Sequence, residues 1–157
     1  MAKRITLEVV LILAITVALS WLLLGLVSLV DSTDPVAAFV DGAPRMLFGV
    51  TAIALVLWTI MLIIGAIAHR NRRVGWRIAT HLVSLFVALL INVIVFVVLA
   101  FVNTNEGGWG LLLAGIALGV GLVVGVAGIV AVLLVELVIL RQKKPLEAAV
   151  PAPEAPQ

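Results

Sequence analysis

Four long runs of apolar residues, separated by short polar segments, dominate the pattern along this chain. Each run reaches the length of about 20 residues that a helix needs to cross roughly 30 Å of hydrocarbon. The runs predict membrane-spanning helices at about residues 5–30, 46–68, 78–102 and 111–140. We therefore expect an all-α fold, an integral membrane four-helix bundle with short loops that occupies residues 1–144.

The composition favours the same class. Hydrophobic residues make up 64% of the chain and charged residues 11%, and the mean hydropathy is +1.34, whereas a water-soluble domain covers its core with polar side chains. The chain has no cysteine, which excludes disulfides, thiolate catalysis and iron–sulfur ligation. The bias toward Ala, Val, Leu and Gly is typical of a bacterial source with a GC-rich genome.

The first apolar run has an alternative interpretation as a cleaved secretory signal, because Lys3 and Arg4 precede it. The apolar core of such a signal spans about 7 to 15 residues. This run continues to Val30 and no clear small-residue cleavage pattern follows it. We therefore expect the run to be retained as the first membrane helix.

The cations fall on one side of the predicted topology. Nine of the ten Lys and Arg residues lie before the first helix, between the second and third helices, or after the fourth: Lys3, Arg4, Arg70, Arg72, Arg73, Arg77, Arg141, Lys143 and Lys144. The opposite side carries mainly acidic residues: Asp31, Asp34, Asp41 and Glu106, with Arg45. Because short cytoplasmic loops retain Lys and Arg, the pattern predicts a cell-membrane protein with both termini in the cytoplasm.

Four arginines are concentrated between the second and third helices: Arg70, Arg72, Arg73 and Arg77. Their first interpretation is the topological one. They are also candidate contacts for anionic lipid head groups, at about 1 kcal/mol for each basic residue near such a surface. The pI near 9.7 arises from these membrane-flanking charges, so we expect the lipid bilayer, and no nucleic acid, as a partner.

The polar segments predict further local structure. Asp34 followed by Pro35 is typical of a helix start, which indicates a brief interfacial helix that ends at Gly42. Residues 103–109 are predicted to form a tight polar turn. The Pro- and Ala-rich segment 145–157 has no apolar periodicity and is predicted to be a disordered cytoplasmic tail.

The fourth apolar run is rich in glycine, which lets membrane helices approach closely. Gly115 and Gly119 lie on one helix face, and Gly121, Gly125 and Gly128 lie on a neighbouring face. We expect one face to pack against the other three helices and the other to contact a second copy or a different membrane protein. The alternative is that both faces pack within one monomer.

Asn92 lies near the midpoint of the third run, where a polar side chain is costly unless it faces protein or water. It shares a stripe with His81, and Thr51 and Trp58 mark a comparable stripe on the second run. Both stripes are predicted to face the bundle axis. For Asn92 we expect an interhelical hydrogen bond, which contributes about 0.6 kcal/mol on average in a membrane protein; the alternative is a polar waypoint in a translocation path.

One ionisable residue on each helix lies at a similar depth near the arginine-rich ends: Glu8, His69, His81 and Glu136. Because His titrates near neutral pH and carboxylates bind cations, these residues are candidates for an intramembrane proton or metal site. The alternative is that they pair with flanking cations, as Glu8 can with Arg4 one turn earlier. A haem between His69 and His81 is disfavoured because both flank one short loop, and we expect no bound cofactor.

The sequence contains no recognisable grouping of Ser, His and Asp, no phosphate-binding loop and no pair of catalytic carboxylates. We therefore assign no catalytic residue and expect no enzymatic activity. The glycine faces and the scarce intramembrane polarity favour an accessory or scaffolding subunit of a membrane complex. The alternative is a small homo-oligomeric transporter or channel.

Overall fold

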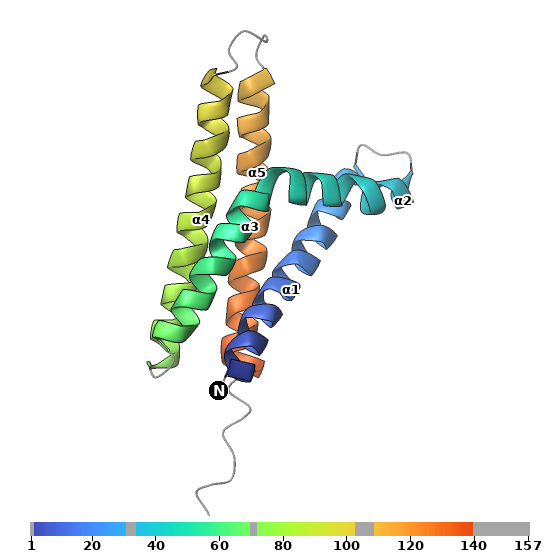
Figure 1. Ribbon diagram of the computed structural model, residues 1–157. Helices are drawn as coiled ribbons and strands as arrows, with labels where there is room; N and C mark the ends of the chain where they lie inside the picture. The colour runs from blue at the N-terminus through green and yellow to red at the C-terminus, as the bar shows by residue number, and fades with distance from the viewer. Residues whose placement is uncertain (1, 31–33, 70–71, 103–108, 140–157) are drawn as a thin grey trace, which may run out of the picture.

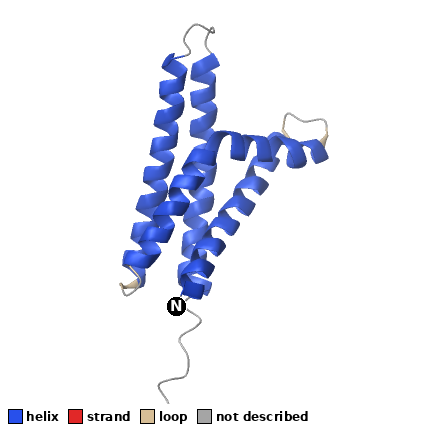
Figure 2. Cartoon of the chain, viewed as in Figure 1, coloured by secondary structure: helices blue, strands red, loops and turns tan. Residues whose placement is uncertain are grey.

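The computed structural model describes residues 2–30, 34–69, 72–102 and 109–139, and no strand occurs among them. The elements, in chain order, are α1 (Ala2–Ser28), α2 (Pro35–Ala37), the π-helix η1 (Ala38–Gly42), α3 (Ala43–Ala68), α4 (Val74–Val102), α5 (Trp109–Leu133) and the π-helix η3 (Leu134–Ile139) (Figures 1 and 2). The predicted all-α four-helix bundle is confirmed. The described residues contain four helices long and apolar enough to cross a membrane.

The long helices extend beyond the apolar runs that predict them. α1 begins at Ala2 and α4 at Val74, although the sequence pattern places their starts at about residues 5 and 78. Hydropathy marks only the part of a helix that suits hydrocarbon, whereas backbone hydrogen bonding continues into the polar flanks. The predicted turn at 103–109 falls almost wholly outside the described residues, as does the predicted tail at 145–157.

The segment after α1 forms the short helix that the sequence predicts. Asp34 caps it, because one carboxylate oxygen accepts hydrogen bonds from the backbone N–H groups of Val36 and Ala37 at 2.9 and 3.3 Å. The prediction that this helix ends at Gly42 is wrong, since the chain stays helical through η1 and into α3. Pro44 lacks an N–H group and crowds the preceding turn, and the wider turn of η1 lets the helix continue past it.

The helical segment from α2 into α3 forms an arm that points away from the α4–α5 pair, and α3 then bends to run alongside that pair (Figure 1). Two polar side chains donate hydrogen bonds to backbone carbonyl oxygens in the N-terminal third of α3. Asn92 on α4 donates to the Val50 carbonyl oxygen at 3.0 Å, and Thr51 donates to that of Leu47 at 2.5 Å. Such competition for backbone acceptors bends helices. The hydrogen bond from Asn92 on α4 to Val50 on α3 confirms the predicted interhelical hydrogen bond.

The arm contacts α1 through two aromatic residues, Phe39 on the arm and Trp21 on α1. The ring of Phe39 in η1 lies against Gly25 of α1 so closely that a Cβ atom at Gly25 would be 2.2 Å from it. The indole N–H of Trp21 donates to the Phe39 carbonyl oxygen at 2.7 Å. Glycine is therefore required at position 25 for this packing.

The α4–α5 hairpin extends past the bend in α3 (Figure 1). At its far end the two backbones approach closely, since a Cβ atom added to Gly110 would lie 2.7 Å from the Ala100 carbonyl oxygen. Large apolar side chains there face outward, with Phe101 70% and Leu111 76% exposed. Exposed apolar side chains on a long helix are suited to contact with lipid or with another membrane helix.

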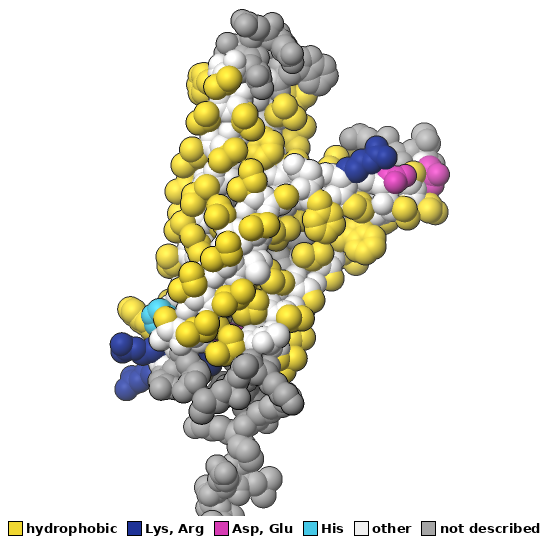
Figure 3. Space-filling view, viewed as in Figure 1, with side chains coloured by type: hydrophobic (Ala, Val, Ile, Leu, Met, Phe, Trp, Pro, Cys, Tyr) yellow, Lys and Arg dark blue, Asp and Glu magenta, His cyan; other side chains and the backbone are white. Residues whose placement is uncertain are grey.

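Two groups of buried apolar residues form the core. The larger group joins all four long helices and η3: Val9, Ile12, Trp58, Leu62, Ala66, Leu85, Ala88, Ala131, Val132 and Val135. The smaller group joins α1, α3 and α5: Leu24, Ala43, Leu47, Val120 and Val124. Apolar side chains also cover the outside of the bundle, between cations at the α3–α4 end and a charged group on the arm (Figure 3).

Candidate functional site

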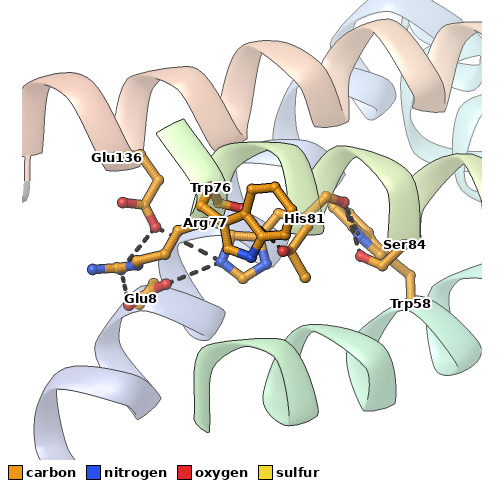
Figure 4. Close-up of polar contacts among 8 residues, drawn as sticks. Glu8, Trp58, Trp76, Arg77, His81, Ser84 and Glu136 are labelled. Carbon is orange, nitrogen blue, oxygen red and sulfur yellow. Dashed lines mark hydrogen bonds and ion pairs between the residues drawn. The ribbon is translucent and has the colours of Figure 1, made fainter. Parts of the chain in front are cut away.

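Four ionisable side chains from three helical segments meet at the end of the bundle that holds the start of α1 (Figure 4). They are Glu8 on α1, Arg77 and His81 on α4, and Glu136 in η3, and we call them the ionic cluster. Each of the four is buried, with exposed fractions of 3%, 8%, 1% and 1%. All four lie within candidate membrane spans, where ionisable residues are costly and mark functional sites.

A single nitrogen of Arg77 joins the two carboxylates. Its Nη2 atom lies 2.6 Å from Oε2 of Glu8 and 2.8 Å from Oε1 of Glu136. The imidazole of His81 completes the cluster, with Nε2 at 3.1 Å from Oε1 of Glu8 and 3.7 Å from Oε1 of Glu136. The cluster therefore links α1, α4 and η3 through charged groups.

Local helix geometry explains how the cluster forms. Arg77 and His81 are four residues apart, so their side chains project from the same face of α4. Glu136 lies in a π-helical turn, which changes the direction of side chains relative to the regular helix before it. Single π-turns of this kind occur frequently at functional sites.

Neighbouring residues contact both the backbone and the ring of His81. The backbone carbonyl oxygen accepts hydrogen bonds from Ser84 Oγ at 2.8 Å and from the Trp58 indole at 3.4 Å. α3 approaches the ring closely, since a Cβ atom at Gly65 would lie 3.7 Å from Nδ1 of His81. Two buried polar atoms of the cluster have no hydrogen-bond partner, namely Nδ1 of His81 and Oε2 of Glu136.

The structure brings together three of the predicted site residues, Glu8, His81 and Glu136, whose ligand-type atoms lie within 4.8 Å of one another. It does not bring His69 into this group; its ring is at the end of α3 and its buried Nδ1 has no hydrogen-bond partner. Asn92 also lies elsewhere, at the bend of α3. The predicted set was too large because the depth of a residue does not determine the direction of its side chain.

Arg77 corrects the sequence prediction most strongly. The sequence groups it with loop cations that contact lipid, but the structure buries it between two carboxylates. Arg72 and Arg73 are exposed, as a head-group contact requires, and Arg70 lies outside the described residues. The four-residue spacing from Arg77 to His81 is the sequence signal that relates Arg77 to the site.

The guanidinium of Arg77 makes the cluster a poor metal site. Glu8, His81 and Glu136 each offer a ligand atom, and His with carboxylates suits several divalent ions. However, Arg77 lies within 2.8 Å of both carboxylates, so a metal ion between them would have to displace a charge that is already bound. The arrangement suits a singly charged species that leaves Arg77 in place better than it suits a divalent ion.

The glycines of α5 divide into a packed face and an open face. A Cβ atom at Gly125 or Gly128 would contact leucines of α4, at 3.2 and 2.7 Å, and one at Gly121 would lie 4.0 Å from Leu89. A Cβ atom at Gly115 or Gly119 would meet nothing within 4 Å. We define the open face of α5 by four residues that share one side of the helix: Gly115, Gly119, Leu122 and Val126.

The open face adjoins a groove between α4 and α5 of about 420 Å³. The side chains that line the groove are apolar, and Leu122 and Val126 of the open face are among them. A groove of this chemistry is suited to an apolar helix or a lipid chain rather than to a polar solute.

The four candidate spans and the helical bundle define a small multi-pass membrane protein. Comparison of the chain with protein-family models, with curated proteins and with solved structures returned no match. The specific function is therefore argued from the ionic cluster and from the open face of α5.

Proposed function

We propose that this protein is a non-enzymatic accessory or scaffolding subunit of a membrane complex, and that the open face of α5 binds a transmembrane helix of another subunit. One observation carries the proposal: Gly115 and Gly119 lie one turn apart, and a Cβ atom added to either would meet no neighbouring atom of the described chain within 4 Å. Glycines at this spacing allow the backbones of two membrane helices to approach closely.

The neighbouring side chains support an apolar helix as the partner. Leu122 is 64% and Val126 56% exposed, and both border an apolar groove. A polar or water-soluble partner would gain little from this surface, because it offers almost no hydrogen-bonding group. An apolar helix with small residues of its own would fill the space above the glycines and gain dispersion contacts along the groove.

Photo-crosslinking in native membranes tests this proposal. A photoreactive residue in place of Leu122 should form a stoichiometric crosslink to a different membrane protein, whereas one in place of the equally exposed Val56 on α3 should not. Gly119→Leu should abolish the crosslink without unfolding the chain, because the added side chain points into open space. Equal crosslinking from both positions, or a crosslink that Gly119→Leu leaves unchanged, would exclude the open face as the interface.

The ionic cluster favours a second candidate, a small homo-oligomeric transporter, since intramembrane ionisable residues commonly mark transport pathways. Buried apolar residues pack next to the cluster, among them Trp58 and Leu62. Transport would therefore require these residues to move. A crosslink from Leu122 to a second copy of the same chain would support this candidate and exclude the accessory-subunit proposal.

We also propose that both termini lie in the cytoplasm and that Arg72 and Arg73 contact anionic head groups there. The exposed cations near the start of α4 support this orientation. Because the chain has no cysteine, single substitutions can be labelled selectively. A membrane-impermeant thiol reagent added outside intact cells should label Asp41→Cys and leave Arg73→Cys unlabelled; the reverse result would invert the topology.

A further inference from the structure

The charges of the ionic cluster do not balance by themselves. Glu8 and Glu136 supply two carboxylates, and Arg77 supplies one guanidinium, which stays protonated in proteins. When His81 is neutral, one negative charge remains in excess. All four side chains are buried, and an uncompensated charge in such a place is strongly disfavoured. The cluster therefore requires one further positive charge.

Among the side chains that the structure describes, those of residues 5–30, 34–69, 72–102 and 110–138, no other charged group supplies that charge. α1 contributes Glu8, α4 contributes Arg77 and His81, and η3 contributes Glu136. α3 packs against the cluster with Gly65, which has no side chain to offer. His69 at the end of α3 has no ion pair with the cluster and is not part of the close group of ligand-type atoms.

The hydrogen bonds of the two carboxylates are unequal. Both oxygens of Glu8 are engaged, Oε2 by Arg77 and Oε1 by His81. Glu136 is engaged only through Oε1, and its buried Oε2 atom has no partner. Glu8 and Arg77 therefore form the fixed ion pair, whereas Glu136 and the neighbouring His81 retain groups that can gain or lose a proton.

We propose that the ionic cluster is a proton-binding site, which holds one exchangeable proton shared between Glu136 and His81 beside the fixed Glu8–Arg77 pair. A proton restores neutrality without displacing Arg77 from the two carboxylates. A divalent metal ion bound beside Arg77 would leave one positive charge in excess, and charge neutrality would require Arg77 to be displaced from both carboxylates. This inference is independent of what binds to the open face of α5.

The proton reaches the cluster from the arginine-rich end of the bundle. In Figure 4 the guanidinium of Arg77 points toward the end of η3, and His81 lies farther along α4. On the other side of His81 the large apolar side chains of Trp58 and Leu85 pack next to the cluster, and the buried polar side chains of Thr51 and Asn92 lie farther along the bundle. Because these apolar side chains separate the cluster from the next buried polar groups, we expect the site to exchange protons with the aqueous phase at the arginine-rich end.

Spectroscopy on the purified full-length chain in detergent micelles tests the proposal. In a His69→Gln background, His81 is the only histidine, so nitrogen NMR reports its protonation, and infrared spectra of carbon-labelled glutamate report a protonated carboxyl. At about pH 7 the spectra should show either the NMR signal of a protonated His81 imidazole or the infrared band of a protonated glutamate carboxyl. This signal should disappear reversibly as the pH rises. Both signals should be absent in Glu136→Gln, in which Glu8 and Arg77 balance each other.

Two further variants provide a second test of the charge balance and a control. Glu8→Gln should also abolish the signal, because Glu136 and Arg77 then balance. Asp41→Asn removes an exposed carboxylate on the arm and should leave the signal unchanged.

Three results would overturn the proposal. The first is the absence of both signals from the chain with both cluster glutamates, and the second is a signal that persists unchanged in Glu136→Gln. The third is stoichiometric binding of added Zn²⁺ to the otherwise unchanged chain with loss of the signal, which would make the cluster a metal site.

Discussion

The two ends of the bundle are held together by different chemistry. At the end that holds the start of α1, charged side chains from three segments meet around Arg77. Toward the other end, beside the smaller apolar core group, close glycine contacts join helical segments in pairs, α1 with η1 at Gly25 and α4 with α5 at Gly110. The charged end joins distant segments in one cluster, whereas each glycine contact joins two neighbours in sequence. The difference predicts that the charged end determines the tertiary arrangement and that the glycine end determines local hairpins.

Replacing Arg77 should have the largest effect. Arg77→Gln leaves two buried carboxylates without their guanidinium, and removal of one partner from a buried ion pair costs about 3–5 kcal/mol. The free energy of unfolding in detergent, measured with a denaturing detergent as titrant, should fall by an amount of this order. The exposed Arg73 provides the matched control, and Arg73→Gln should be nearly neutral. Equal effects of the two substitutions would mean that the charged end does not determine the arrangement.

Gly110→Ala should weaken the opposite end by a smaller amount. Its Cβ atom would approach a backbone oxygen at 2.7 Å, and overpacking of this kind costs about 1–3 kcal/mol. Gly115→Ala is the matched control, since its Cβ atom meets nothing; a gain in helix propensity of up to about 1 kcal/mol is expected there. Thermal unfolding of both variants in the same detergent checks the pair, and a stable Gly110→Ala protein would argue against close contact between α4 and α5.

Asn92→Ala should have the smallest effect on stability. It removes one hydrogen bond to the Val50 carbonyl oxygen, and such bonds contribute about 0.6 kcal/mol on average in membrane proteins. The more informative readout is the shape of α3, because distances between spin labels on the arm and on α4 should change as the bend relaxes. Thr59→Ala, which removes a hydrogen bond within α3, should leave those distances unchanged. An unaltered bend in Asn92→Ala would assign the bend to another cause.

Some parts of the candidate site were predictable from the sequence. Glu8, His81 and Glu136 lie at the same depth, and the four-helix topology brings residues of equal depth to one level of the bundle. The rotation of each helix about its own axis does not follow from the sequence pattern, because several apolar residues can equally well face lipid or core. The sequence pattern therefore groups His69 with the site, although its ring lies outside the cluster, and groups Arg77 with the surface cations, although it lies inside the cluster.

The sequence by itself determined the helices and the number of candidate spans. Both follow from local hydropathy, since a segment in lipid must satisfy its backbone hydrogen bonds within itself. Only the tertiary structure decided that Arg77 joins Glu8 to Glu136, and that one glycine face of α5 is packed while the other is open. These pairings connect residues far apart in the chain, and they depend on the relative rotation of packed helices, which apolar patterns alone do not specify.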